Sequence, residues 1–230
     1  MKVLISDFDN TFFTDKYLEN IEAIQEFVNK GNKFVIATGR PLYLLKPDIQ
    51  DLNIPYSNLI CSDGTIIFDR EDKIIYRETI NPKIVKKIIN ELKENPYVED
   101  WYNNEAYKYS KDEDAPSNGI LGVPKDREKV AELIEILNKK YPDTHSYLSH
   151  KWLNILNKET SKGTGVEALM KLNNWSIDEI ITIGDELNDV PMNAIFNSYT
   201  FHYANEELKS VSTYVVNDFK DALKHIYENN

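Results

Sequence analysis

Two aspartates, Asp7 and Asp9, end an apolar run in the stretch MKVLISDFDNTFFTD. In an extended strand, residues i and i+2 share a face, so the two carboxylates are expected side by side where a buried strand ends. Two unit charges about 4 Å apart repel by roughly 4 kcal/mol at an effective dielectric constant of about 20. The pair is therefore unfavourable unless a cation lies close to both carboxylates.

Polar residues also follow other apolar runs of the sequence. They are Thr38 and Gly39 after KFVIA, Ser62 and Asp63 after NLIC, and Asp185 after IITIG. Ligands of an open parallel sheet bind beyond the carboxyl ends of its strands, so we expect these residues to converge with Asp7 and Asp9, and Asp189 to lie nearby. All-oxygen ligands favour Mg²⁺ over zinc, and Mg²⁺ commonly accompanies phosphate substrates.

Lys162, in ETSKGTGVEALMKL, falls at the expected start of a helix. A cation there opposes the helix macrodipole by about 0.3 to 1 kcal/mol, and residues that break a local rule are often functional. A lysine beside the free N–H groups of a helix start could hold a phosphate. Taken alone, the position fits a phosphate clamp and a purely structural role equally well.

Each aspartate has a structural alternative as well. Asp9 and Thr11 could cap a turn, and Asp185 could be the N-cap of a helix in ELNDV. Asp189 could simply interact favourably with the helix dipole in the first turn of that helix. Capping does not explain why the ends of four apolar runs carry polar residues together with a lysine. As a set, these residues therefore indicate a site for a cation and a phosphate.

Apolar runs alternate with helical patterns in the first and last parts of the chain, which is typical of a parallel α/β sheet. Strands are expected at residues 2–6, 33–37, 58–61, 179–185, 199–203 and 213–216. Helices are expected from Leu18 to about Gly31, at 162–172 and near the C-terminus, and a short helix before a break at Pro47. The run TIIFDREDKIIYRET predicts an antiparallel hairpin.

Residues 81–158 follow a different order. Helical stripes at 84–92 and 130–137 alternate with pairs of strands, expected at 97–104 and 105–110 and then at 144–149 and 151–157. The acidic stretch 111–119 is expected to be a solvated loop, and the aromatic residues of the strands, Trp101, Tyr102, Tyr107 and Tyr109, to pack the sheet. The order αββαββ predicts an inserted α+β module at 81–158 between two parts of a core, 1–80 and 159–230.

Composition excludes several classes of protein. The formal net charge of −11 argues against a nucleic-acid or anionic-membrane partner. Cys61 is the only cysteine, so an internal disulfide is impossible and the reducing cytoplasm is the expected compartment. The apolar run before Asp7 is too short for a signal peptide. The histidines His145, His150, His202 and His225 lie in no motif and are expected to be structural or exposed.

Together the motifs resemble the haloacid dehalogenase superfamily of phosphohydrolases. DFDNT matches that family's DxDx[TV] motif, ATGR its second motif, Lys162 its third and GDELNDVPM its fourth, GDxxND, in the family's order. The insert resembles the type IIB cap of the Cof-like sugar-phosphate phosphatases. Two residues depart from the pattern: Asn10 replaces the usual glycine, and Asp63 stands where Cof-like members usually have asparagine.

The resemblance implies a Rossmann-like core with a type IIB cap, and a Mg²⁺-dependent phosphatase of small phosphorylated metabolites such as sugar phosphates. Asp7 would attack phosphorus and Asp9 would act as acid and base. The Asp7 carboxylate, the Asp9 carbonyl and Asp185 would hold Mg²⁺. The groups holding the phosphoryl oxygens would be Thr38, Gly39, Lys162 and Asn188, with Asp189 in support. A phosphomutase and a non-catalytic metabolite-binding regulator are alternatives, and a monomer or weak homo-oligomer is expected.

Overall fold

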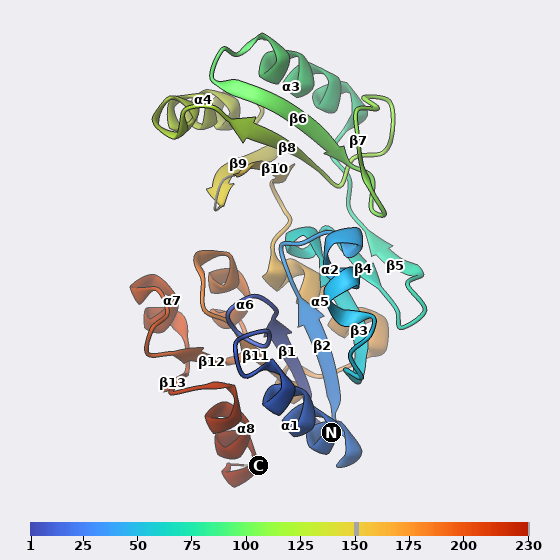
Figure 1. The fold of residues 1–230 in the computed structure, drawn as a ribbon, viewed down its shortest axis with the longest axis vertical. Helices are drawn as coiled ribbons and strands as arrows, with labels where there is room; N and C mark the ends of the chain where they lie inside the picture. Colours follow the sequence, from blue (N-terminus) through green and yellow to red (C-terminus); the bar gives the residue numbers. More distant parts are fainter. Residues whose placement is uncertain (150–151, 230) are drawn as a thin grey trace. The chain divides into compact units, whose positions relative to one another are not determined.

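A computed structural model describes residues 1–149 and 152–229 (Figure 1). The chain forms two compact units: a core unit of residues 1–40, 44–76 and 161–230, and an insert unit of residues 41–43 and 77–160. The domain limits expected from the sequence, with an insert at 81–158, stay a prediction. His150 and Lys151, the first residue of an expected strand, lie outside the described residues.

The core unit is built on an eight-stranded sheet in the order β13-β12-β11-β1-β2-β3-β4-β5. Its strands are β1 Val3–Asp7, β2 Lys33–Ala37, β3 Tyr56–Cys61, β4 Ile66–Phe68, β5 Ile74–Arg77, β11 Ile180–Ile183, β12 Asn197–Phe201 and β13 Tyr214–Val216. β1 lies between β2 and β11 and is parallel to both, whereas β4 is antiparallel to β3. The central strands β1, β2 and β11 are buried along most of their length, which is why their sequences are mainly apolar.

Helices cover both faces of this sheet. They are α1 Tyr17–Asn29, α2 Leu42–Ile49, α5 Lys162–Asn173, α6 Val190–Asn193, α7 Glu206–Val211 and α8 Phe219–Glu228. Val35 packs with residues of α5 and α6 in one buried cluster. Phe34 points to the opposite face, where its ring contacts Phe12, which in turn contacts Phe219 of α8. On that face α1 and α8 lie side by side (Figure 1).

Two local predictions for the core unit are wrong. Leu18, predicted on the buried face of its helix, is 59% exposed, and the first turn of α1 is instead anchored by Tyr17, whose ring contacts Phe13. Pro47 lies inside α2 and does not end it. A proline removes one helical hydrogen bond, and here the flanking Leu45 and Ile49 are both buried, so packing holds the short helix together.

The insert unit is a five-stranded sheet with two helices on one face (Figure 1). The sheet order is β7-β6-β8-β10-β9, and the elements are α3 Pro82–Glu94, β6 Val98–Asn104, β7 Tyr109–Ser110, β8 Gly119–Pro124, α4 Arg127–Lys140, β9 Thr144–Ser149 and β10 Trp152–Asn157. Apolar residues of both helices and of β6, β8 and β10, including Trp101, share one buried cluster, and Leu148 of β9 packs against it.

The sequence pattern does not predict β8, because its sequence GILGVP contains two glycines and a proline, which are rare in strands. The pairing of β8 with β10 explains why a glycine suits position 122. A Cβ at Gly122 would lie 3.1 Å from the Leu153 side chain of β10, which is a tight contact. The strand expected at 105–110 shrinks to the two residues of β7. β6 and β8 therefore form the first long strand pair of the insert, and β10 and β9 the second.

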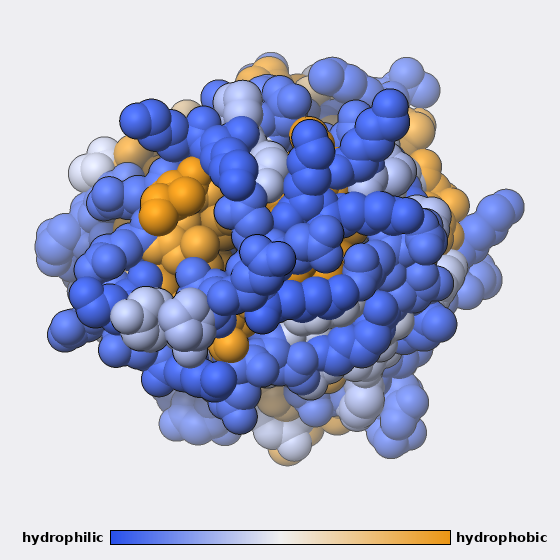
Figure 2. Space-filling view, turned by 90° about the horizontal axis from the view of Figure 1, so that it is seen from above, coloured by the Kyte–Doolittle hydropathy of each residue, from blue (hydrophilic) through white to orange (hydrophobic). Residues whose placement is uncertain are grey.

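No helix within residues 1–149 and 152–229 is both long enough and apolar enough to cross a lipid bilayer. Figure 2 shows one face of the molecule, on which hydrophilic side chains predominate and apolar side chains form only small patches. This surface accords with the 28% share of charged residues in the sequence.

Candidate active site

The carboxyl ends of β1, β2 and β11 bring the predicted acidic residues together. Asp7 is the Cα partner of Ala37, and Ser6 is the partner of Ile183, so the loops that follow these strands start at one edge of the sheet. Carboxylate oxygens of Asp7, Asp185 and Asp189 all lie within 4.8 Å of one another. All three residues are buried, so their charges meet where water screens them poorly.

Lys162 lies among these carboxylates. It is the first residue of α5, and its Nζ donates to Asp7 Oδ1 at 2.5 Å and to Asp189 Oδ1 at 2.7 Å. Its side chain is only 1% exposed. Burial opposes the charged form, but the carboxylates of Asp189, Asp7 and Asp63 outweigh this and raise the pKa of Lys162 well above its usual value. These ion pairs explain why Lys162 is tolerated at the start of a helix, where a positive charge opposes the helix dipole.

The GTG after Lys162 allows α5 to approach helix α6 and the turn after β3. A Cβ at Gly163 would lie 2.6 Å from the carbonyl oxygen of Pro191, and a Cβ at Gly165 would lie 2.8 Å from the Cα of Gly64. A larger residue at either position would push α5 away from α6 or from the turn after β3. The two glycines therefore help to bring the Lys162 side chain to the carboxylates.

Asp185 is held by Thr11, whose Oγ1 donates to Asp185 Oδ1 at 2.6 Å. Burial raises the pKa of Asp185 to about 6, and the charge of Asp189 adds to this, while the Thr11 hydrogen bond opposes it. The capping alternative for Asp185 is wrong: Glu186 is the N-cap, and its carboxylate accepts from the Leu187 N–H.

Asp189 supports the site. Its Oδ1 accepts from Lys162, and its Oδ2 accepts from the backbone N–H groups of Asp185 at 3.0 Å and Glu186 at 3.1 Å. Both oxygens are therefore occupied by donors of the chain itself. Asp7 and Asp185 remain as the carboxylates of this cluster that are better suited to bind a metal.

The Asp9 carboxylate is directed to Arg40, and the structure does not join it to the Asp7 cluster. Arg40 Nε donates to Asp9 Oδ2 at 2.8 Å, and Nη2 binds Asp9 Oδ1. The same guanidinium also binds Asp48 at 2.6 Å. Arg40 ends the ATGR motif, but nothing in the spacing of the sequence indicates which carboxylates it meets.

Tyr203 is a second residue that the sequence did not indicate. Its hydroxyl donates to the carbonyl oxygen of Asn10 at 2.6 Å, across a separation of 193 residues. Asn10 has a backbone φ of 57°, a left-handed conformation that asparagine adopts more readily than most residues. This explains how Asn10 can replace the glycine common in the family. Tyr203 therefore fixes the loop that follows Asp9.

The residues expected to hold phosphoryl oxygens lie at the same edge of the sheet. Thr38 is buried, and its Oγ1 accepts from the backbone N–H of Arg40. The Nδ2 of Asn188 donates to Asp63 Oδ1 at 2.9 Å. A Cβ at Gly39 would lie 3.2 Å from that same oxygen, so Asp63 borders both Gly39 and Asn188.

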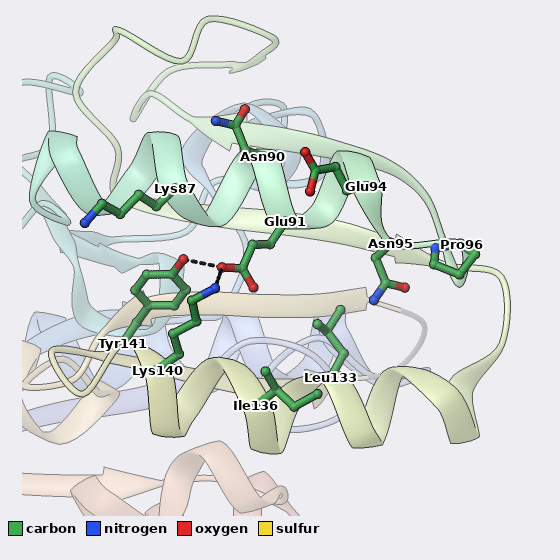
Figure 3. Close-up of a pocket in the computed structure, with 10 residues that line it drawn as sticks. All are labelled: Lys87, Asn90, Glu91, Glu94, Asn95, Pro96, Leu133, Ile136, Lys140 and Tyr141. Atoms are coloured by element: carbon green, nitrogen blue, oxygen red, sulfur yellow. Dashed lines mark hydrogen bonds and ion pairs between the residues drawn. The ribbon is translucent and has the colours of Figure 1, made fainter.

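A separate pocket of about 790 Å³ lies in the insert unit between α3 and α4 (Figure 3). Leu133 and Ile136 contribute apolar surface, and Glu91 is bound by both Lys140 and Tyr141. None of the predicted site residues lines this pocket. Because Glu91 is already paired, we place the chemistry at the carboxylates of the core unit.

The carboxylate cluster fits a divalent cation. Burial raises the pKa of Asp7 well above its usual range, and Asp189 and Asp185 raise it further, although Lys162 opposes the shift. Three carboxylates thus surround one ammonium group, which leaves an excess of negative charge in a buried place. A hard cation with oxygen ligands removes this excess.

The affinity of the cluster for a divalent cation is expected to fall as the pH drops below about 6, because burial raises the pKa of Asp185 to about 6. A carboxylate must be ionised to bind a metal, so a proton competes with the cation there. From this group alone the dissociation constant, measured by titration calorimetry, should rise roughly fourfold between about pH 7.5 and 5.5. An affinity that does not change over this range would contradict the assignment of Asp185.

The stability of the metal-free protein should change in the opposite direction. The folded-state pKa of Asp185, about 6, lies above its ordinary value of 3.8, so the folded protein holds the proton more tightly. The contribution of Asp185 to the free energy of unfolding is therefore greatest at low pH and is lost as the pH rises from about 4 to 6. Asp185→Asn should remove this part of the pH dependence.

Comparisons with known proteins agree with this geometry. The sequence model of one protein family, the haloacid dehalogenase-like hydrolases, matches residues 4–120 and 100–222 of this chain. Phosphatase YwpJ of Bacillus subtilis is 24% identical in an alignment of 274 residues. The alignment covers 92% of this chain and 93% of that protein. Pyridoxal phosphate phosphatase YbhA of Escherichia coli is 23% identical over 255 residues, which cover 94% and 93%.

A solved structure from Plasmodium vivax, described as a candidate HAD/COF-like hydrolase, superposes with a TM-score of 0.84 at 22% identity and covers 100% of this chain and 96% of that one. This likeness confirms the expected α/β fold. The relatives named phosphatases support the prediction of a phosphoric monoester hydrolase. Because the family's model covers most of the sequence, the chain belongs to the haloacid dehalogenase-like hydrolases.

Proposed function

We propose that the chain is a Mg²⁺-dependent phosphatase of small phosphorylated metabolites that works through an aspartyl-phosphate on Asp7. The observation that carries the proposal is the buried Asp7 carboxylate at the end of β1, held by Lys162 and close to Asp185. The phosphatases named among its relatives, one of them acting on pyridoxal phosphate, support a small phosphate monoester as substrate.

In the first step an oxygen of Asp7 attacks phosphorus, and the bond between phosphorus and the ester oxygen breaks. Asp9, which must turn away from Arg40 and carry a proton for this step, gives that proton to the leaving alcohol oxygen, and the phosphoryl group stays on Asp7. In the second step water attacks this phosphorus, Asp9 takes the proton of that water, and inorganic phosphate leaves. The Asp7 carboxylate is thereby restored.

The groups around Asp7 have separate tasks in this scheme. Lys162 orients the Asp7 carboxylate and, with Thr38, the Gly39 amide and Asn188, donates to the phosphoryl oxygens, where charge accumulates in the transition state. Mg²⁺ would be held by the carboxylates of Asp7 and Asp185 and the carbonyl of Asp9, and when bound it would reduce the repulsion between two anions. Asp189 keeps Lys162 in place.

Asp9→Asn should distinguish the acid step from the rest of the mechanism. For alkyl phosphates, whose leaving oxygen needs a proton, kcat is expected to fall by about 10²- to 10⁴-fold. The loss should be much smaller for p-nitrophenyl phosphate, because p-nitrophenolate leaves without one. Asp48→Asn, at the other carboxylate bound by Arg40, is the matched control and should affect both substrates little. Equal losses of kcat for the two leaving groups in Asp9→Asn would contradict this role.

The proposal is tested by a hydrolysis screen of purified protein with p-nitrophenyl phosphate, sugar phosphates, nucleotides and phosphorylated cofactors, with and without Mg²⁺. Hydrolysis that requires the metal is the expected result. Release of phosphate also separates a phosphatase from a phosphomutase, which would move the group between positions of one sugar. No hydrolysis of any substrate would end the proposal. The cytoplasmic location, the absence of a nucleic-acid partner and the monomeric or weakly oligomeric state remain predictions.

A further inference from the structure

Asp63 is the residue of the site whose role the mechanism leaves open. It lies in the short 3-10 turn Ser62–Gly64 that follows β3, and it is only 9% exposed. Its backbone has a left-handed φ of 52°, which few residues other than glycine, asparagine and aspartate adopt at low cost. The backbone conformation of the turn therefore favours glycine, asparagine or aspartate at position 63. Of these three residues, aspartate is the one that carries a charge.

The Asp63 carboxylate contacts Asn188 and lies close to Gly39, two of the residues proposed to hold the phosphate. Its Oδ1 accepts from the Asn188 Nδ2 at 2.9 Å, and both carboxylate oxygens lie at 3.2 to 3.3 Å from the position a Cβ would take on Gly39. Its backbone N–H donates to the carbonyl of Thr38. Its charge also contributes, after burial and the closer carboxylates of Asp189 and Asp7, to the shift in the pKa of Lys162.

A phosphate bound between Gly39 and Asn188 would thus have an anionic neighbour within the protein. We propose that Asp63 weakens the hold of the site on a phosphate dianion and so limits the affinity for both substrate phosphate and product phosphate. The inference rests on the proposed function, since it assumes that Gly39 and Asn188 face the phosphate. Repulsion between like charges acts strongly here because Asp63 is buried.

The variant Asp63→Asn removes the negative charge of the side chain and keeps nearly the same side-chain shape. Asparagine keeps an oxygen that can accept from Asn188, and it tolerates φ near 52° as well as aspartate does. Inorganic phosphate is titrated into the Mg²⁺-loaded wild-type protein and the variant by calorimetry, and its inhibition constant is measured during hydrolysis of p-nitrophenyl phosphate. The variant should bind phosphate about tenfold or more tightly, with a parallel fall in KM.

Two further variants complete the test. Asp51→Asn removes the same formal charge from an exposed position of the core unit and should leave phosphate affinity unchanged. Asp63→Gly, which suits the left-handed backbone, also removes the charge and should shift phosphate affinity in the same direction if Asp63→Asn does not fold.

The outcomes separate this inference from the proposed function. Wild-type protein that hydrolyses p-nitrophenyl phosphate, together with an Asp63→Asn variant of unchanged or weaker phosphate affinity, would overturn the inference alone. Wild-type protein that neither hydrolyses phosphate esters nor binds inorganic phosphate would overturn the proposed function itself. Tighter binding in Asp63→Asn but not in Asp51→Asn supports the local charge of Asp63 as the cause.

Discussion

Asp7→Asn is expected to lower kcat for p-nitrophenyl phosphate by about 10⁴-fold or more, because an amide cannot act as the nucleophile that forms the covalent intermediate. The remaining groups would still bind the substrate, so KM should change far less than kcat. Steady-state hydrolysis with Mg²⁺ at saturating concentration measures both quantities. A kcat within tenfold of wild type would show that another group attacks phosphorus.

The same variant should remain folded, which separates chemistry from stability. The amide oxygen that replaces Asp7 Oδ1 could still accept from Lys162, and one of the buried carboxylates would lose its charge. Because burial and neighbouring carboxylates raise the pKa of Asp7, ionised Asp7 is unfavourable in the metal-free protein. The melting temperature of metal-free Asp7→Asn should therefore be equal to or above that of metal-free wild type.

Lys162→Met is expected to reduce both activity and stability. The change leaves the buried carboxylates of Asp7 and Asp189 without their shared cation, and removing one partner of a buried ion pair costs about 3 to 5 kcal/mol. Loss of a donor to the phosphoryl oxygens should lower kcat by about 10²- to 10³-fold. Urea unfolding of the metal-free protein and steady-state hydrolysis measure the two effects.

Lys171→Met is the matched control, because Lys171 lies on the same helix but is exposed. A surface change of this kind should alter the free energy of unfolding by no more than about 0.5 kcal/mol. If Lys162→Met were as stable as Lys171→Met, the ion pairs of Lys162 would not hold the acidic loops together. If it kept full activity, Lys162 would have no part in binding phosphate.

The strands that position the site could be predicted because they are buried on both faces. β1 and β2 are apolar along most of their length, so their ends, and the polar residues that follow, are visible in the sequence. β8 could not be found in this way, because its two glycines and its proline are untypical of a strand, and the close contact of Gly122 with Leu153 of β10 appears only after folding. The exposure of Leu18 likewise depends on where the helix meets the sheet.

For the site, motif spacing selected the acidic residues but could not assign their contacts. Asp189 is saturated by Lys162 and two backbone N–H groups, whereas Asp9 is bound by Arg40. The ion pairs of Asp189 with Lys162 and of Asp9 with Arg40 join residues 27 and 31 positions apart, and they depend on which side chains face each other after folding. The contact between Asp63 and Asn188 spans 125 residues and is of the same kind.

The central claim is that Asp7 becomes phosphorylated during turnover. The most direct measurement is mass spectrometry of protein mixed with p-nitrophenyl phosphate and Mg²⁺ and quenched in acid within one turnover, followed by digestion and sequencing of the N-terminal peptide by fragmentation. We predict that wild-type protein gains the mass of one phosphoryl group on Asp7 and that Asp7→Asn gains none. An active protein whose Asp7 stays unmodified, or whose phosphoryl group lies on another residue, would contradict the account.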